Sequence, residues 1–185
     1  MQIGYAPLTK RLLKRLNDEA EYHRAKDERP TVAIMIWHRD TDQFLGILGK
    51  RIGVDSGENP GLVKGGKQRR ENILKAARRE SREEIKTKAE QLEFKGFIGT
   101  YRIPSLRGPY RWKYYICLFG IYSGPLDIDF DRDELSGSQW FGRDGIEPFL
   151  RPLYFDRPEK YEALMQAFSN GLDFIDRYCA TPSPS

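Results

Sequence analysis

The segment Lys64–Lys86, KGGKQRRENILKAARRESREEIK, decides how the whole 185-residue chain is interpreted. It opens with a Gly-Gly pair among basic residues and continues as a run without proline or glycine. Alanine, leucine, lysine, arginine and glutamate dominate that run and favour helices, so residues 71–86 are predicted to be helical. The glycine and the charged residues follow the spacing G-x5-E-x7-R-E-x-x-E-E.

The predicted helix gathers carboxylates on one face. At about 100° per residue, Glu80, Glu83 and Glu84 lie within about 60° of Glu80. Ionised carboxylates at this spacing repel one another, and a hard divalent cation such as Mg²⁺, which prefers oxygen ligands, reverses the sign of that interaction. The Gly65-Gly66 turn allows the backbone to approach a ligand closely, and the basic residues around it suit a polyphosphate. The segment therefore predicts a metal site that acts on a polyphosphate.

A solvated helix with acidic and basic faces is the alternative interpretation. Pairs such as Glu83-Glu84 are common on protein surfaces. The six specified residues, however, should coincide by chance on the order of once in a million registers. The full spacing therefore favours a functional site over a merely solvated surface.

The spacing resembles the Nudix box, G-x5-E-x7-R-E-U-x-E-E-x-G-U, in which U is a bulky aliphatic residue. Every charged position of that box is matched between residues 65 and 87. The departures are Ser81 and Thr87, which replace U, and Lys86, which replaces the late glycine. Ser81 removes a core contact, and Lys86 removes the residue that usually ends the helix. These departures concern local packing, because all the carboxylates remain.

The resemblance implies an α/β fold in which a mixed β-sheet is packed between helices, with extra helices at the N- and C-termini. It implies hydrolysis of a diphosphate linked to another group, with Mg²⁺ or Mn²⁺ as the cofactor. Arg79 is expected to hold a glutamate through a charge-assisted hydrogen bond. By the same resemblance, the expected metal-binding residues are Lys64 or Gly65 through a backbone carbonyl, and Glu71, Glu80, Glu83 and Glu84.

A further carboxylate is expected after the acidic segment 125–133. Glu134 precedes a strand that contains Trp140-Phe141, and this order resembles the late Nudix element that carries an additional metal ligand or the general base. A water that attacks phosphorus must be oriented from the side opposite the leaving group, so a base on a separate loop suits the chemistry. Solvent exposure of Glu134 is the alternative. The choice of base among the glutamates stays open.

Basic and aromatic residues elsewhere predict contacts with the substrate. Arg107, Tyr110 and Trp112 lie in one loop and can hold a phosphate and stack a base. The alternative is a hairpin loop whose aromatic rings pack only on the surface. Together with the cations near the first hairpin and the glycine turn, the predicted substrate-binding residues are Arg51, Lys64, Lys67, Arg107, Tyr110 and Trp112.

Hydrophobic periodicity predicts the remaining elements. The predicted strands are 31–37, 44–51, 92–103, 112–123 and a strand around 140–141, and the predicted helices are 8–27, 144–149 and 158–178. Gly96 and Gly99 predict bulges or a close backbone approach in a strand. Residues 151–156 are interpreted as a loop whose Tyr154 and Phe155 could cap a pocket. The domain interpretation is an N-terminal helical extension 1–30, a Nudix hydrolase domain 31–180 with its C-terminal helix, and a disordered tail 181–185.

Composition narrows the class of protein. The chain is 39% hydrophobic and 31% charged, with a formal net charge of +4, which is ordinary for a soluble domain that binds anions. The two cysteines do not form a disulfide framework, and Cys117 is expected to be a buried thiol. No run is apolar enough for a signal core or a membrane span, so the expected location is cytoplasmic.

Three hypotheses for function remain open at this stage. The first is hydrolysis of the diphosphate in a nucleoside diphosphate-linked compound, with a nucleotide or other diphosphate-containing small molecule as the partner. The second is pyrophosphate removal from an RNA 5′ end, which the basic N-terminal helix and the KQRR turn favour. The third is a Nudix-like module that senses a nucleotide without cleaving it. The N-terminal helix packs on the domain, contacts RNA or a membrane surface, or forms a homodimer contact.

Overall fold

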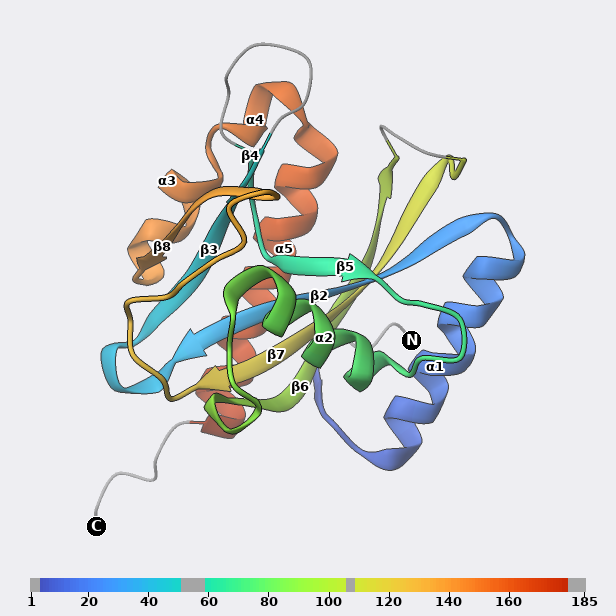
Figure 1. The fold of residues 1–185 in the computed structure, drawn as a ribbon, viewed down its shortest axis with the longest axis horizontal. Helices are drawn as coiled ribbons and strands as arrows, with labels where there is room; N and C mark the ends of the chain where they lie inside the picture. Colours follow the sequence, from blue (N-terminus) through green and yellow to red (C-terminus); the bar gives the residue numbers. More distant parts are fainter. Residues whose placement is uncertain (1–3, 51–58, 106–108, 180–185) are drawn as a thin grey trace.

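The computed structural model describes residues 4–50, 59–105 and 109–179, and their architecture is an α/β fold (Figure 1). The strands are β1 (Ala6–Pro7), β2 (Glu28–His38), β3 (Gln43–Gly49), β4 (Asn59–Gly61), β5 (Val63–Gly66), β6 (Leu92–Pro104), β7 (Trp112–Tyr122) and β8 (Leu135–Phe141). The α-helices are α1 (Lys10–Ala25), α2 (Ile73–Ile85), α3 (Ile146–Leu150), α4 (Leu153–Asp156) and α5 (Pro158–Phe174). Short 3-10 turns cover 39–41, 89–91 and 143–145, and a π-helical turn covers 175–179.

The described strands form one mixed sheet in which β2 is central. The strand order is β1-β6-β7-β2-β3-β4, with β5 paired to β2 and β8 paired to β3. β2 runs parallel to β7 along its whole length, whereas the other pairs are antiparallel. On its other edge β2 pairs first with β5, where Val32 lies opposite Gly65, and then with β3 at Trp37. The Gly-Gly turn is therefore held directly against the centre of the sheet.

Both faces of the sheet are covered, which explains why β2 reads as a continuous apolar run. Alternate β2 residues, among them Val32 and Ile34, face a core shared with α1 and α2. The residues between them, such as Met35, face a second core shared with α3, α4 and α5. In Figure 1, α2 lies in front of the sheet and α5 behind it. The expectation of a mixed sheet packed between helices is therefore confirmed.

Helix α2 is shorter than predicted at its N-terminus. It begins at Ile73 because Asn72 is the N-cap, whose side-chain oxygen accepts a hydrogen bond from the backbone N–H of Lys75 at 2.9 Å. Glu71 therefore lies before the helix, not in its first turn as predicted. At the other end, Lys86 adopts the left-handed conformation (φ 50°) in place of the expected glycine, so α2 ends there without one.

Two local features differ from what the motif or the sequence pattern leads one to expect: the serine at position 81 and the structure of the segment 151–156. The Ser81 side chain is buried, and its hydroxyl donates to the backbone carbonyl of Ala77 at 2.6 Å, so the polar group is satisfied within the helix. The prediction of a loop over 151–156 is wrong, because residues 153–156 form α4 with Leu153 fully buried. Tyr154 and Phe155 are exposed on that short helix.

Two other predictions about local structure, the irregularities in the strand 92–103 and the buried thiol, are confirmed. The register between β6 and β7 shifts at two places, between Phe94 and Gly96 and between Phe97 and Thr100, and Gly99 has a φ of 121°. Cys117 is fully buried in β7. None of the helices that the structure describes combines the length and hydrophobicity required to span a bilayer.

Candidate active site

Strand β5 and helix α2 bring the Gly-Gly turn against the acidic face of the helix. Glu80 and Glu84 are buried on the side of α2 that faces β5. A Cβ atom placed on Gly65 would lie 1.8 Å from Cδ of Glu80, so no other residue fits at position 65 without moving the carboxylate. The glycine that begins the sequence motif is thus required by the close approach of the Glu80 side chain.

Arg79 is the centre of this arrangement. Its guanidinium binds Glu71 in a bidentate manner, with Nε and Nη2 each 3.0 Å from a carboxylate oxygen. Nη1 donates to Glu80 at 2.5 Å and to Glu83 at 3.0 Å, and Nη2 also donates to the carbonyl of Gly66 at 2.9 Å. These bonds raise the pKa of Arg79 above its usual range, chiefly through Glu71. The same pairing lowers the pKa of Glu71, which also accepts a bond from the backbone of Gln68.

The buried carboxylates are destabilised as anions. Desolvation is the main cause that raises the pKa of Glu84 to about 7, although the neighbouring Lys64 acts in the opposite direction. Oε2 of Glu84 accepts a hydrogen bond from the backbone N–H of Lys64 at 3.0 Å. Desolvation also raises the pKa of Glu80, against the effect of Arg79. In each case nearby carboxylates contribute to the increase, so the cluster holds more negative charge than its protein partners offset.

The loop before β8 contributes a carboxylate to the same region. Glu134 is exposed, and its charge is among the causes that raise the pKa values of both Glu80 and Glu84, which places it near them. Backbone bonds hold this loop, since the N–H of Asp131 donates to the carbonyl of Glu84 at 2.8 Å and the carbonyl of Glu134 accepts from Lys50 at 3.1 Å. The fold therefore brings together the helix carboxylates and the loop carboxylate that the sequence singled out.

The residues predicted to bind substrate are distributed differently. Lys67 does not face the glycine turn, because its side chain is 4% exposed and its Nζ lies 2.5 Å from Oε1 of Glu21. Trp112 begins β7, and the guanidinium of Arg102 lies 4.8 Å from its ring centroid. Tyr110 is half-buried, two residues before the start of that strand. Lys64 is half-buried beside Glu84.

Arg51 and Arg107, the other two predicted substrate-binding residues, lie outside the described residues.

Sequence reasoning missed a cation beside the turn. A Cβ atom on Gly66 would lie 2.7 Å from Nε of Arg29, so this exposed β2 side chain reaches over the turn. Arg29 also acts electrostatically on Tyr115, whose pKa burial nevertheless raises to about 12. The only indication of Arg29 in the sequence is its position at the start of the buried strand. Its place beside Gly66 follows from the pairing of β2 with β5, which the sequence does not reveal.

The donor atoms fit a hard divalent cation in their chemistry. They are carboxylate and backbone carbonyl oxygens, and a cation would offset the burial and mutual repulsion that raise the pKa values of Glu80 and Glu84. In the described parts of the chain, no three His, Cys, Asp or Glu side chains converge as a ready-made metal site. In this structure, the carboxylates of Glu71, Glu80 and Glu83 are instead engaged by the guanidinium of Arg79.

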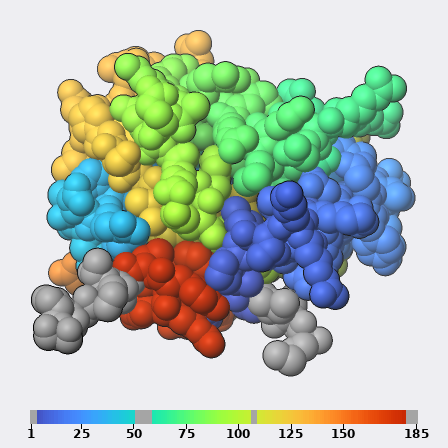
Figure 2. Space-filling model, turned by 90° about the horizontal axis from the view of Figure 1, so that it is seen from below, coloured from blue at the N-terminus to red at the C-terminus, as the bar shows by residue number. Residues whose placement is uncertain are grey.

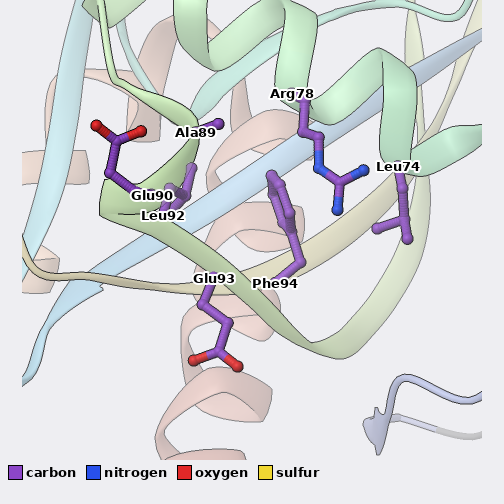
Figure 3. Close-up of a pocket in the computed structure, with 7 residues that line it drawn as sticks. All are labelled: Leu74, Arg78, Ala89, Glu90, Leu92, Glu93 and Phe94. Carbon is purple, nitrogen blue, oxygen red and sulfur yellow. The ribbon is translucent and has the colours of Figure 1, made fainter.

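A separate pocket lies between α2 and the start of β6 (Figure 3). Its volume is about 390 Å³, and it is lined by Leu74, Arg78, Ala89, Glu90, Leu92, Glu93 and Phe94. None of these residues belongs to the cluster around Arg79. The pocket is therefore separate from the candidate active site.

Comparisons with known proteins agree with this geometry. Residues 27–164, more than half of the chain, match the family model described as the NUDIX domain. Among solved structures, a NUDIX hydrolase from Nitrosomonas europaea has a TM-score of 0.60 and 18% identity, over 79% of this chain and 89% of that one. A C. elegans Ap4A hydrolase in a binary complex has a TM-score of 0.54 and 17% identity, over 78% of this chain and 98% of that one. A search of curated proteins finds no match. At these identities the likeness concerns the fold alone.

Proposed function

Because this chain belongs to the NUDIX domain family, we propose that it is a hydrolase that cleaves the diphosphate linkage of a nucleoside diphosphate-linked compound with Mg²⁺ or Mn²⁺. The observation that carries this proposal is the cluster around Arg79 beside the Gly-Gly turn. One guanidinium there engages the carboxylates of Glu71, Glu80 and Glu83, while Glu84 stays buried with a raised pKa. Such a surplus of carboxylates suits a divalent cation and a phosphate substrate.

The residues divide into metal-binding and positioning roles. The carboxylates of Glu71, Glu80, Glu83 and Glu84, with a carbonyl of Lys64 or Gly65, would hold the metal. A bound divalent cation supplies neutralisation of charge on the phosphoryl oxygens and a water of lowered pKa. Arg79 orients the carboxylates through its fixed fork of donors.

Two carboxylates are candidates for the general base. Glu134 comes from a loop separate from α2, so it can orient water from a different side of the substrate. Glu84 is the other candidate, because its pKa of about 7 suits proton transfer near neutral pH. Glu134→Gln separates the two hypotheses, since loss of the base should lower kcat more than KM, whereas Glu84→Gln also removes a carboxylate that would hold the metal.

A nucleotide is the favoured substituent on the diphosphate. The fold neighbour from C. elegans is an Ap4A hydrolase, which supports a nucleotide class without naming the substrate of this chain. Aromatic and cationic side chains also lie together on one hairpin, where Arg102 stacks over Trp112. Such a pair can hold a base and a phosphate.

The decisive experiment is a hydrolysis screen with Mg²⁺ and with Mn²⁺. The panel contains nucleoside triphosphates, dinucleoside polyphosphates, nucleotide sugars, dinucleotide cofactors and a 5′-triphosphorylated RNA. Glu84→Gln is the inactive control and Glu90→Gln, an exposed glutamate outside the cluster, is the matched active control. Metal-dependent cleavage that only Glu84→Gln loses supports the proposal. Tight binding of one ligand without cleavage by the wild type would favour a nucleotide sensor instead.

RNA 5′ ends are the second candidate substrate, and one surface feature favours them. Lys75, Arg78 and Arg82 are exposed along the outer ridge of α2, and their charged side-chain groups form no hydrogen bond or ion pair with another described residue. A ridge of free cations suits a phosphate backbone. If RNA is the substrate, Arg78→Glu with Arg82→Glu should weaken its cleavage and reduce the salt dependence, while cleavage of a mononucleotide substrate stays unchanged.

A further inference from the structure

We propose that helix α1 supports the active site, and that its residues Asn17, Glu21 and Arg24 are positioning residues for the loop that carries Glu71. The family match begins at residue 27, so the whole of α1 (10–25) lies outside it. Figure 2 shows this blue helix directly beside the green segment that follows β5. This inference rests on the proposed function, because the loop matters only if the cluster around Arg79 works with a metal.

The first contact holds the start of α2. The side-chain oxygen of Asn17 accepts a hydrogen bond from the backbone N–H of Ile73 at 2.9 Å, and Ile73 is the first residue of the helix. The first N–H groups of a helix lack partners within it, and Asn72 satisfies only that of Lys75 in this way. Asn17 is itself oriented, because its amide donates to the carbonyl of Leu13 at 2.8 Å. Helix α1 therefore adds a second anchor to the start of α2, beside the cap by Asn72.

The second contact holds the other end of the loop. Nη2 of Arg24 donates to the backbone carbonyl of Lys67 at 2.7 Å, and Nε of Arg24 lies 3.1 Å from a carboxylate oxygen of Glu21. The other oxygen of Glu21 lies 2.5 Å from Nζ of Lys67, whose side chain is 4% exposed. A buried ammonium group requires a partner, so Lys67 is held in place by α1. This pairing also lowers the pKa of Glu21.

The loop between these two contacts leads directly to the catalytic cluster. Glu71 lies within it and binds both the N–H of Gln68 and the guanidinium of Arg79. Arg70, one residue before, adopts a left-handed conformation with φ 62°, which costs about 1 kcal/mol or more for a residue other than glycine. A loop with such a residue keeps its shape only when its surroundings hold it. Contacts of α1 therefore reach the metal-binding carboxylates through Glu71 and Arg79.

A purely structural role for α1 makes a different prediction. Leu12, Leu16 and Ala20 bury the apolar side of the helix in the core shared with α2. If that packing were its whole role, substitutions on the polar side would change thermal stability alone. If the polar side positions the loop, they should change the metal requirement even in variants that remain folded.

The experiment compares Asn17→Leu and Glu21→Gln with Asn17→Asp and Arg15→Gln. Asn17→Asp keeps an oxygen acceptor for the N–H of Ile73, and Arg15 is an exposed residue of α1 that serves as the matched control. The measurements are the Mn²⁺ concentration for half-maximal kcat, Mn²⁺ affinity without substrate, and hydrogen exchange of the amides in 67–73. We expect a weakening of metal affinity by about tenfold or more in the first two variants, as for outer partners of metal ligands. Arg15→Gln should resemble the wild type, and Asn17→Asp, which keeps the acceptor for Ile73 but loses the bond to Leu13, should lose less metal affinity than Asn17→Leu.

The outcomes separate this inference from the proposed function. Unchanged Mn²⁺ affinity and unchanged exchange in Glu21→Gln would overturn the positioning role, whatever the activity. A wild type that binds Mn²⁺ but cleaves no substrate would overturn the proposed function, and the affinity comparison would still test α1. If Asn17→Leu does not fold, Glu21→Gln decides the question, because glutamine keeps an oxygen that can accept from the ammonium of Lys67 and the variant should still fold.

Discussion

The backbone N–H of Lys64 donates a hydrogen bond of 3.0 Å to the carboxylate of Glu84, whose residue is only 5% exposed. One neutral donor is little compensation for a buried carboxylate, so desolvation dominates and raises its pKa to about 7. Among the glutamates of α2, Glu84 is thus the one whose ionised form the protein alone stabilises least.

Glu84→Gln should stabilise the metal-free protein at alkaline pH relative to the wild type. The ordinary pKa is 4.5 and the folded pKa is raised to about 7. Because its pKa is raised, the protonated carboxyl group adds about 3 kcal/mol to the free energy of unfolding below about pH 4.5. This contribution is lost as the pH rises through 7. Urea unfolding with EDTA at pH 5 and pH 8 measures this. Exposed Glu83→Gln is the control, and a stability difference between wild type and Glu84→Gln that does not vary with pH would contradict the prediction.

Gly65→Ala should abolish most of the activity. The new methyl group would meet Glu80 at 1.8 Å, so the carboxylate has to move. Displacement of a catalytic group by about 1 Å costs about 100-fold in rate. The measurement is kcat with saturating metal, together with a melting curve. Gly137→Ala is the matched control, because a Cβ atom there would lie 3.5 Å from Leu48 and fits without strain. Equal activities of the two variants would argue against the close approach of Glu80.

Arg79→Lys should reduce kcat about 10- to 100-fold without unfolding the protein. Lysine keeps the charge but loses the planar fork that binds both oxygens of Glu71 and reaches Glu80 and Glu83. Steady-state kinetics over a range of Mg²⁺ concentrations tests this. Arg78→Lys, the exposed neighbour on the same helix, should behave as the wild type. Full activity of Arg79→Lys would show that charge alone is sufficient at this position.

Glu134→Gln should lower kcat with little change in KM if Glu134 is the general base. General-base catalysis contributes about 100-fold or more, so a loss of that size is expected. Asp133→Asn, at the adjacent exposed residue, is the control. A kcat that does not change in Glu134→Gln would mean that Glu134 is only a solvent-exposed residue. Glu84 would then remain as the candidate base.

Trp112→Ala should raise KM for nucleotide substrates about tenfold if a base stacks on this ring. In the structure the guanidinium of Arg102 lies over the ring and is also paired with Glu28, so a base would stack on the other face of the ring or displace Arg102. The kinetic constants for a nucleotide and for inorganic tripolyphosphate separate stacking from phosphate contacts. An unaltered KM for the nucleotide would support the interpretation that the aromatic residues of the hairpin only pack on the surface.

Much of the fold and the acidic face of α2 could be predicted because their signals are local. A β-branched apolar run predicts the buried strand β2, and the spacing of glutamates predicts their shared helix face. The true start of α2 depended on a cap, since Asn72 competes with the helix preference of Glu71. The helix α4 depended on burial of Leu153, which the segment alone does not reveal.

The parts that could not be predicted depend on residues far apart in the sequence. Lys67 was expected to bind substrate because it is a cation beside the glycine turn. Its actual partner, Glu21, is on the N-terminal helix, and nothing in the local pattern links the two. The bond between Asn17 and Ile73 and the position of Arg29 over Gly66 likewise follow from strand pairing and helix packing. The sequence shows which residues are charged, but it does not show which partner each charged side chain contacts.

The parallel pairing of β2 with β7 has a consequence for the order in which the protein can mature during synthesis. Every element of the acidic cluster except the Glu134 loop is translated before β7, yet β5 rests on β2, whose full-length neighbour is β7. Parallel pairs between distant segments form slowly, because a long stretch of chain must close first. A nascent chain that ends before Tyr122 would therefore carry all four glutamates of residues 71–84 without a completed sheet to support them.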